Sequence, residues 1–540
     1  MNYLSFDPLY NPYGSFQMPV YGKKGMVATS HPLAAQAGLD ILKRGGNAVD
    51  AAIGAAASLT VLEPNSTSIG GDAFALVWHG GRLYGLNASG PAPKGMSIDA
   101  LRQAGYSKIP EWGVLPVTVP GTPAAWQALS EKFGRLPLTE SLEPAIRYAE
   151  EGFPLSPVIG YNWKLWVERI AAKLEGQEPF DAFFETFAPG GRIPEAGMLW
   201  KSPDHARTLQ LIAQTKAEAF YRGELAEQIG AFMKRYDGFL SQEDLASYAP
   251  EWVEPISVNY RGFDVWEIPP NGQGLVALMA LNLVKGFDFA EKDCVETCHK
   301  QIEAMKLSFE EGFRYITDSR KMKVPVQQLL SEEHANNRRQ LITDRIYNPD
   351  LSSLPNGGTV YLAAADGEGN MVSFIQSNYK AFGSAIVIPG TGINLQNRGM
   401  DFSMNPNHDN ALEPGKKTYH TIIPGFLTKG GQPVGPFGVM GGYMQPQGHL
   451  QILMNTIDFR MNPQAALDAP RWQWRENNTL ELEPSFPNHI AEALARKGHH
   501  VVRATNSYGF GRGQIIWRDA ETGVYAGASE SRADGQVAAW

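Results

Sequence analysis

Hydrophobic positions near the start of the chain recur at helical spacing and are interrupted by glycine pairs. In "HPLAAQAGLDILKRGGN" apolar residues lie three and four positions apart, and the run stops at Gly45-Gly46, a typical helix end. Asn47 can cap a second helix, "AVDAAIGAAASLTVL", whose small residues favour close packing. Strand-like runs follow at 74–79 and 82–87, and a glycine pair joins them, as in a hairpin.

Helical patterns dominate from Thr122 to about Met305, and past Pro355 the character changes. Short β-rich runs then prevail: "TVYLAAAD", "MVSFIQSN", "SAIVIPG", "TIIPGFLT", "GQIIWRD" and "GVYAGAS". "DGEGN" predicts a hairpin turn, and helices return in "MQPQGHLQILMNTIDF", "PQAALDAPRW" and "HIAEALARKG". The most loop-like segment, "HANNRRQLITDRIYNPDLSSLPNGG", ends just before Thr359. The whole pattern predicts an α+β fold in which antiparallel sheet is covered by helices.

Composition and charge narrow the function classes. The chain has 540 residues, 43% of them hydrophobic and 19% charged, with a net charge of −9 and no cluster of Lys and Arg. A nucleic-acid partner is therefore not expected. The start, "MNYLSFDPLYNPYGSF", has no signal-peptide pattern, and the longest apolar stretch, 51–62, is too short to cross a bilayer. We expect one or two closely packed lobes of a soluble protein that stays in the cytoplasm.

A threonine directly behind two glycines stands at the start of the predicted strand "TVYLAAAD". Gly358–Thr359 can be a plain turn followed by a strand, or it can be a bond that is cut. Cleavage would give Thr359 an α-amine beside its own hydroxyl, and an amine with a pKa of about 7.7–8.0 can act as the base for that nucleophile. Gly358 suits the cleavage because a residue without Cβ can expose its carbonyl to Thr359 Oγ1.

Acyl transfer also needs hydrogen-bond donors for the tetrahedral oxyanion. "GVMGGYMQPQG" offers the backbone N–H groups of Gly441 and Gly442, although the same segment alone would read as a tight turn before a helix.

Other candidate sites carry weaker signals. Cys294 and Cys298 lie four residues apart on a predicted helix beside His299, but further ligands at helical spacing are missing, which favours ordinary buried thiols over a metal site. The histidines show no metal-ligand spacing, and His499-His500 is expected to be solvated. "GFGRG" at 509–513 lacks the strand and helix context of a phosphate loop. We expect neither a metal nor a cofactor.

The chain resembles the γ-glutamyltranspeptidase family of N-terminal-nucleophile hydrolases along nearly its whole length. The motifs that carry this resemblance include "LDILKRGGNAVDAAI", "SIGGDAFAL", "VPGTPAAWQAL", "GGTVYLAAADGEGNMVSF", "DFSMNPN", "GVMGG" and "GASESRADG", in the family's order. The resemblance implies a proenzyme that cuts itself before Thr359 into residues 1–358 and 359–540. It also implies an αββα sandwich built from both fragments and acyl transfer through an ester on Thr359.

The resemblance assigns roles to individual residues. Thr359 matches the nucleophile and Ser377 a hydroxyl residue that supports it. Gly441 and Gly442 match the oxyanion hole, and Asp401 matches the carboxylate that holds a substrate α-amino group.

Departures from the family pattern fall in the substrate pocket. Ser89 stands where typical members have an arginine for the substrate α-carboxylate, and His420-Thr421 replaces a pair of serines. Tyr379 replaces an asparagine, Arg398 replaces a Gln or Glu near the α-amine, and Val360 replaces a second threonine next to the nucleophile.

These departures leave the chemistry intact and change the expected substrate. Arg398 favours a carboxylate at the far end of the acyl group, as in glutaryl amides, over the α-amine of a γ-glutamyl group. A local ion pair with Asp401 is the alternative role for Arg398. The short segment between Asp401 and His420 suggests a more open cleft than in members with a lid.

The leading hypothesis is therefore a self-processing threonine amidohydrolase for γ-glutamyl or glutaryl-like amides. A transpeptidase that passes the acyl group to amino acids, and an uncleaved, inactive binding or scaffold protein of the same fold, remain alternatives.

Overall fold

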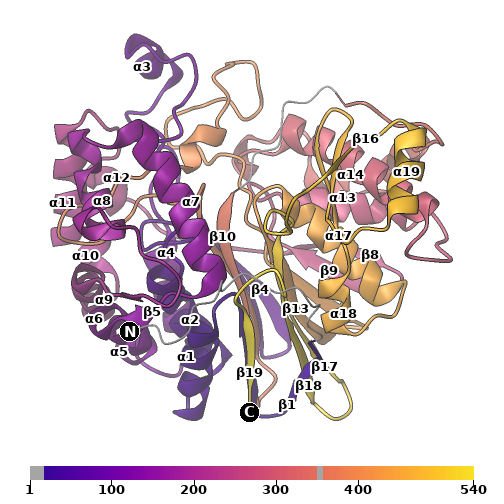
Figure 1. The fold of residues 1–540 in the computed structure, drawn as a ribbon, viewed down its shortest axis with the longest axis horizontal. Coiled ribbons are helices and arrows are strands. Elements are labelled where there is room, and N and C mark those ends of the chain that lie inside the picture. The colour runs from indigo at the N-terminus through magenta and orange to yellow at the C-terminus, as the bar shows by residue number, and fades with distance from the viewer. Residues whose placement is uncertain (1–16, 350–356) are drawn as a thin grey trace, which may run out of the picture.

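Two antiparallel sheets lie face to face, and helices cover the outer face of each (Figure 1). The computed structural model describes residues 17–349 and 357–540. Residues 1–16, where no signal peptide is expected, and 350–356, in the predicted loop before Thr359, lie outside the described residues. The αββα sandwich predicted from the resemblance is confirmed.

The first sheet joins strands from the two ends and the middle of the chain. Its order is β19 (Gln536–Ala539), β2 (Gly25–Thr29), β10 (Gly358–Asp366), β11 (Met371–Tyr379), β3 (Asp72–His79), β4 (Arg82–Ala88) and β7 (Glu251–Val253). The hairpins predicted at "GG" and "DGEGN" are the β3–β4 and β10–β11 pairs. The two strands that follow the Gly358–Thr359 bond are therefore central in this sheet.

The second sheet runs in the order β1 (Val20–Gly22), β18 (Tyr525–Ser529), β17 (Arg512–Arg518), β13 (Gln432–Met440), β12 (Gly425–Lys429), β9 (Phe263–Glu267) and β8 (Ile256–Tyr260). Side chains of both sheets, among them Phe74, Tyr361, Phe426 and Ile516, form the buried core between the layers. A small third sheet contains β14 (Trp472–Glu476), β15 (Thr479–Leu482) and β16 (His500–Arg503).

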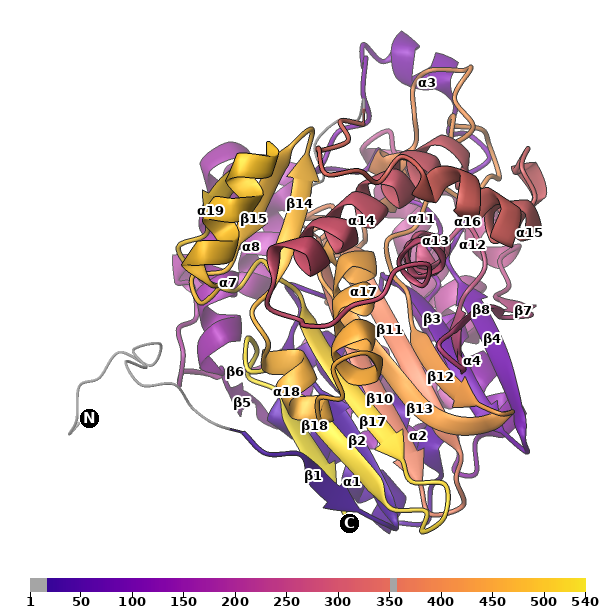
Figure 2. The ribbon, with the colours of Figure 1, turned by 90° about the vertical axis from the view of Figure 1, so that its right-hand side faces the viewer.

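Helices cover the two outer faces (Figure 2). The first sheet is covered by α1 (Pro32–Lys43), α2 (Ala48–Leu62) and α4 (Thr122–Phe133), with α6 (Glu143–Glu151), α7 (Pro157–Leu174), α9 (Pro203–Thr215) and α11 (Glu224–Arg235) in the same lobe. The second is covered by α13 (Gly274–Val284), α14 (Val295–Tyr315), α17 (Met444–Ile457) and α18 (Pro463–Asp468), with α19 (Asn488–Lys497) beside the small sheet.

The predicted cap of the second helix is present. The Asn47 side chain accepts hydrogen bonds from Val49 N and Asp50 N, and the Asp50 carboxylate accepts one from Asn47 N. Every residue of α2 is buried, as its small side chains indicated, so this helix lies directly against β10 and β11. α2 thereby supports the strands on which the candidate site is built.

Three stretches differ from the sequence-based expectation. "SAIVIPG" forms no strand but a turn with one isolated bridge, because the hydroxyls of Ser384 and Thr391 bind nearby backbone groups in place of a ladder. The segment 251–267, inside the stretch where helical patterns dominate, holds β7, β8 and β9. "HANNRR" in the predicted loop forms the end of α16 (Glu332–Arg339), which Ser331 caps.

Candidate active site

Thr359 lies at the start of β10, beside the end of β11. Gly358 pairs with Tyr379, and the register between the strands shifts between Gly358 and Val360, so the regular ladder breaks at Thr359. Bulges of this kind redirect a side chain, and they occur next to active sites. Thr359 is fully buried in the uncut chain.

Two hydroxyl groups meet at the carbonyl oxygen of Gly358. Thr359 Oγ1 donates to this oxygen over 2.7 Å and Ser377 Oγ donates to it over 2.6 Å, while the two hydroxyl oxygens lie 3.0 Å apart. Tyr379 N donates to Ser377 Oγ over 2.8 Å, which fixes the direction of the serine hydroxyl. The Gly358–Thr359 bond therefore lies against a nucleophilic oxygen, and its carbonyl accepts a second hydrogen bond that would stabilise developing negative charge.

The turn that contains Gly441 and Gly442 lies beside the same bond. Gly441 has φ +130° and Gly442 has φ +61°, a region of backbone space that favours glycine. A Cβ on Gly357 would lie 3.2 Å from Gly442 Cα and 3.5 Å from Gly442 N, so the uncut chain runs along this turn. Gly357 therefore packs directly against this turn.

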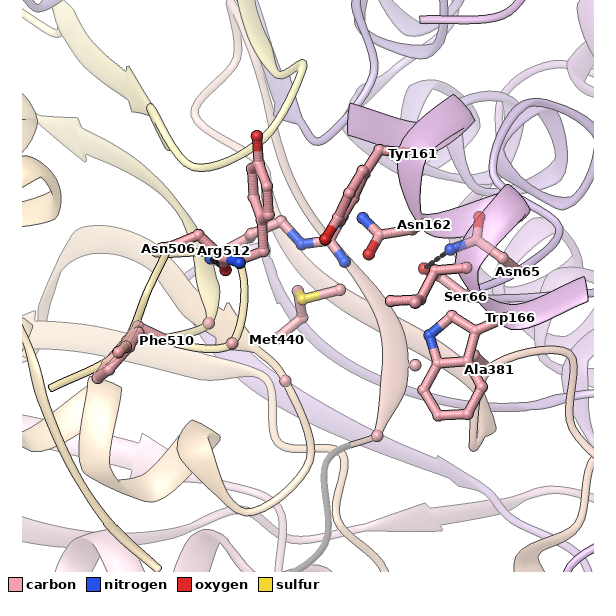
Figure 3. Close-up of a pocket in the computed structure, with 18 of the residues that line it drawn as sticks. Asn65, Ser66, Tyr161, Asn162, Trp166, Ala381, Met440, Asn506, Phe510 and Arg512 are labelled. Atoms are coloured by element: carbon pink, nitrogen blue, oxygen red, sulfur yellow. Dashed lines mark hydrogen bonds between the residues drawn. The ribbon is translucent and has the colours of Figure 1, made fainter. Parts of the chain in front are cut away.

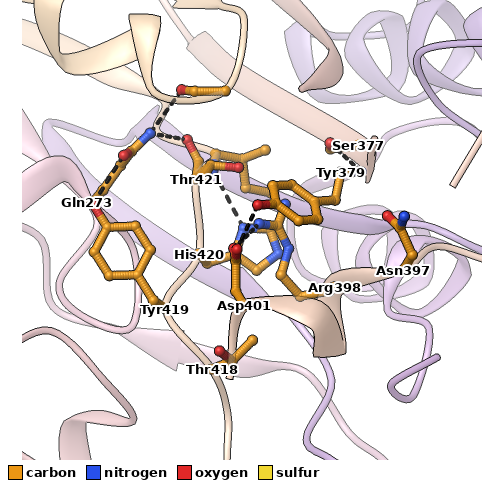
Figure 4. Close-up of polar contacts among 12 residues, drawn as sticks. Gln273, Ser377, Tyr379, Asn397, Arg398, Asp401, Thr418, Tyr419, His420 and Thr421 are labelled. Atoms are coloured by element: carbon orange, nitrogen blue, oxygen red, sulfur yellow. Dashed lines mark hydrogen bonds and ion pairs between the residues drawn. The ribbon is translucent and has the colours of Figure 1, made fainter. Parts of the chain in front are cut away.

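Arg398 and Asp401 form the ion pair that the sequence offered as one alternative (Figure 4). Arg398 Nη1 lies 3.0 Å from Asp401 Oδ2, and both side chains are almost completely buried. The guanidinium also lies 3.9 Å from the centroid of the Tyr379 ring. Its Nε and Nη2 have no hydrogen-bond partner among the described residues.

The carboxylate of Asp401 is already well supplied with donors. Tyr379 and Tyr443 donate to Oδ1, and Arg398 donates to Oδ2. Burial raises the pKa of Asp401, and the nearby Arg398 opposes that rise. Asp401 thus accepts from three donors, whereas Arg398 Nε and Nη2 have no acceptor in the described part of the chain.

His420, Thr421 and Ser89 lie in a neighbouring polar network. His420 Nδ1 accepts from Ile422 N over 3.3 Å, so its Nε2–H donates to Asp72 Oδ2 over 3.0 Å. Ser89 Oγ donates to Asn87 Oδ1 over 2.8 Å and accepts from Asn271 Nδ2 over 3.2 Å. Ser89 therefore belongs to this network and not to the Arg398–Asp401 pair.

Asp72 and Gln273 are two site residues that the sequence reasoning missed. Burial raises the pKa of Asp72 to about 7, with Arg398 close enough to lower it. Gln273 Nε2 donates to Thr421 O over 2.6 Å and to Gly442 O over 2.9 Å, which ties the glycine turn to the β12 side of the site. Asp72 stands in the motif "SIGGDAFAL", which was a usable signal, whereas Gln273 had no local signal.

A buried cluster outside this site corrects the reading of the histidines. His499, expected to be solvated, is buried against His299, whose Nδ1 lies 3.0 Å from His499 Nε2. With Glu303 they bring three possible metal ligands together. The ammonium of Lys306 lies 2.8 Å from Glu303, so that carboxylate already has a cationic partner. The sequence spacing missed the cluster because His499 comes from a distant segment.

The remaining minor candidates are placed as follows. Cys298 is buried and Cys294 is half-buried, and both are free thiols. Residues 509–513 lead into strand β17 and not into a helix. Within residues 17–349 and 357–540, no helix is long and apolar enough to cross a membrane.

Two antiparallel sheets packed face to face between layers of helices form the fold of the N-terminal-nucleophile hydrolases, and this fold places the protein in that class. The model of the γ-glutamyltranspeptidase family matches residues 34–540. The chain belongs to this family.

Named relatives agree with this assignment. The crystal structure of cephalosporin acylase from Bacillus halodurans has 60% sequence identity and a TM-score of 0.97, covering 99% of both chains. The glutathione hydrolase-like YwrD proenzyme of Bacillus subtilis is 37% identical over 96% of this chain and 98% of its own length. The oxamate amidohydrolase proenzyme of Klebsiella pneumoniae is 34% identical over 96% and 98%, respectively.

Proposed function

We propose that the protein is a proenzyme that cuts itself before Thr359 and then hydrolyses amides whose acyl group ends in a carboxylate. The observation that carries the proposal is the pair of hydroxyls, on Thr359 and Ser377, at the Gly358 carbonyl. The three relatives named above are two proenzymes and an acylase, which supports the same reading.

Self-cleavage follows from this geometry in two steps. Thr359 Oγ1 attacks the Gly358 carbonyl carbon, the hydroxyl proton passes to the amide nitrogen, and the C–N bond breaks to leave an ester and a free α-amine. Water then hydrolyses the ester, so fragment 1–358 ends in a carboxylate on Gly358 and remains paired with fragment 359–540. The new α-amine of Thr359 is the base that activates the hydroxyl for substrates, because the ordinary pKa of an α-amine, about 7.7–8.0, leaves part of it neutral near pH 7.

Substrate turnover uses the same oxygen. Thr359 Oγ1 attacks the substrate carbonyl, the N–H groups of Gly441 and Gly442 stabilise the oxyanion, and the amine leaves with a proton from the Thr359 α-amine. Water releases the acyl group from the ester. If an amino acid took the place of water, the enzyme would be a transpeptidase, and stimulation of turnover by added amino acids would reveal this.

The acyl specificity rests on Arg398. Its buried Nε and Nη2 lack partners among the described residues, and a buried guanidinium strongly favours a carboxylate there. Asp401, with three donors already, is poorly placed to hold an α-amine. Oxamate, the substrate in the name of one relative, is also an amide with a carboxylate and no α-amine. The Arg398–Asp401 side of the site therefore suits glutaryl-like amides better than γ-glutamyl amides.

Mass measurement of Thr359→Ala tests the cleavage. Wild type should separate under denaturing conditions into fragments 1–358 and 359–540, whereas Thr359→Ala should remain one chain and be inactive, because it lacks the attacking oxygen. Ser331→Ala, which removes a hydroxyl that caps α16, is a control that should still be cut. A Thr359→Ala chain that splits at this bond would contradict the proposal, and so would an uncut wild type, the state expected of an inactive binding protein.

Arg398→Gln tests the acyl specificity. We expect the ratio of kcat/KM for a glutaryl anilide over its γ-glutamyl counterpart to fall by roughly ten- to a hundredfold, since charge-assisted hydrogen bonds contribute about 1.5–3 kcal/mol. Asp401→Asn serves as the comparison, because it removes the charge that pairs with Arg398 and leaves the guanidinium in place. An unchanged ratio in Arg398→Gln would show that the arginine is structural.

A further inference from the structure

A pocket of about 300 Å³ opens beside the Gly358–Thr359 bond (Figure 3), and the residues that line it do not include Arg398 or Asp401. Its floor includes Gly358, Ala381 and Gly441, and its walls come from α7 and from the loop 504–511. This volume is at the lower end of pockets that hold small organic ligands, about 300–1,000 Å³. If Arg398 binds the acyl end, as in the proposed function, this pocket is the space left for the amine half of the amide.

Arg512 supplies free hydrogen-bond donors to this pocket. Its Nη1 lies 3.0 Å from Glu63 Oε1, and no other described residue accepts a hydrogen bond from its guanidinium. Glu63 is fully buried and also accepts from Ser30 Oγ over 2.6 Å, which holds the carboxylate in place. In Figure 3 the Arg512 side chain extends across the pocket toward Tyr161 and Asn162. A guanidinium held at one nitrogen, with the others directed into a pocket, is a typical partner for a carboxylate.

Aromatic side chains form much of the remaining wall. Tyr161 and Trp166 come from α7, and Tyr508 comes from the loop before β17, whereas the ring of Phe510 points away from the pocket (Figure 3). The rings of Tyr161 and Tyr508 lie 5.2 Å apart and so link the two walls. Flat aromatic surfaces of this kind favour a planar ring over a flexible aliphatic chain.

Asn65 lies next to the bond at the edge of the pocket. Its side chain is 3% exposed, its Oδ1 has no hydrogen-bond partner among the described residues, and it lines the pocket. A Cβ on Gly358 would lie 3.0 Å from the backbone oxygen of Asn65, so this residue is close to the carbonyl that is attacked. Its amide nitrogen donates to Ser66 Oγ over 3.3 Å, which holds this edge of the pocket in place.

We propose that this pocket is the amine-side subsite, and that it selects amides whose amine half carries a planar ring and a carboxylate. Arg512 binds the carboxylate, and Tyr161 and Trp166 pack against the ring. The inference rests on the proposed function and adds the second half of the substrate to it.

A matched pair of substrates tests the charge selection. Glutaryl amides of 4-aminobenzoate and of 4-aminobenzamide share the acyl half and the ring, and they differ only in the charge at the far end of the amine. Wild type should have a kcat/KM at least about tenfold higher for the 4-aminobenzoate amide. The double variant Glu63→Gln/Arg512→Gln removes both charges of the buried pair, and the ratio should fall to near one.

The control is a similar change at an exposed ion pair. Glu143→Gln/Arg147→Gln alters a pair on α6, outside the residues that line the pocket, and should keep the wild-type ratio. Cleavage into two fragments shows that each variant has folded. If the Glu63→Gln/Arg512→Gln chain is not cut, Trp166→Ala replaces it, and the preference for the 4-aminobenzoate amide over the glutaryl amide of β-alanine should fall by about tenfold.

The outcomes separate this subsite from the proposed function. A wild-type ratio near one, or the same ratio in wild type and variant, with both substrates hydrolysed, overturns the subsite and leaves the amidohydrolase intact. Failure of wild type to hydrolyse any glutaryl amide overturns both. Arg398→Gln should lower the rates for both amines equally, because it acts on the acyl half that they share.

Discussion

Arg398 and Asp72 show how burial changes the chemistry of single residues. Arg398 Nη1 is paired with Asp401, and among the described residues Nε and Nη2 have no hydrogen-bond acceptor. Asp72, which accepts from His420, has its pKa raised to about 7 by burial. An anion bound at Arg398 and a charged Asp72 would repel each other, so we expect the anion to bind best while Asp72 is protonated.

Inhibition by free glutarate tests this coupling. Its inhibition constant should rise above about pH 7, because Asp72 then carries a negative charge. In Asp72→Asn, which keeps an acceptor for His420, the rise should be lost. Glutarate has no scissile bond, so the titration of the Thr359 amine in the chemical step does not enter. A rise that persists unchanged in Asp72→Asn would assign the pH dependence to another group.

At the scale of elements, the site depends on the ends of β10, β11 and β13. The ladder between β10 and β11 shifts at Thr359, and β13 ends at Met440, directly before the Gly441-Gly442 turn into α17. Gln273, just before α13, holds that turn in place because its Nε2 donates a hydrogen bond to Gly442 O. A hairpin, a turn and a helix start thus meet at one bond.

Gly441→Val should disable this turn. Gly441 has φ +130°, and an added Cβ would lie 3.1 Å from Gly511 Cα, so a valine would shift the backbone N–H groups away from the oxyanion. Loss of one such donor costs about 2.7–4 kcal/mol, which corresponds to a fall in kcat of roughly a hundred- to a thousandfold. Gly176→Val, at a positive-φ position with open space around it, is the control and should retain near-normal kcat. Normal turnover in Gly441→Val would remove Gly441 from the oxyanion site.

At the scale of the whole molecule, the segments on either side of residue 358 interleave. β10 and β11 lie between β2 and β3 in the first sheet, and β12 pairs with β9 in the second. Cleavage before Thr359 would therefore cut one backbone bond at the start of β10, where Gly358 pairs with Tyr379, and would leave the pairs from Val360 onward and those of the second sheet in place.

The cut protein should consequently behave as one particle. We expect both fragments to elute together from a size-exclusion column near 59.2 kDa, or at a multiple of it, in buffer with 1 M NaCl, and to separate only in denaturant. Salt should not release them, because backbone hydrogen bonds and buried apolar contacts hold the sheets together, and these are little screened. Elution of a free 359–540 fragment in salt would contradict this arrangement.

The sequence by itself determined the local features. The spacing of apolar residues and the glycine pairs placed α1, α2 and the β3–β4 and β10–β11 hairpins, and the ordered motifs identified the family and pointed to Thr359. These signals are local because helix caps, hairpin turns and strand alternation depend on neighbouring residues.

Only the tertiary structure decided which distant residues meet. Asp72 pairs with His420 across 348 positions, Glu63 pairs with Arg512 across 449, and His299 meets His499 across 200. No spacing rule links such residues, so His499 was misplaced and Gln273 was missed. The sequence also left open whether Arg398 pairs with Asp401 or binds substrate. The structure shows the ion pair, and it shows that Tyr379 and Tyr443 bind the other oxygen of Asp401. Only the packing of the lobes brings these four side chains together.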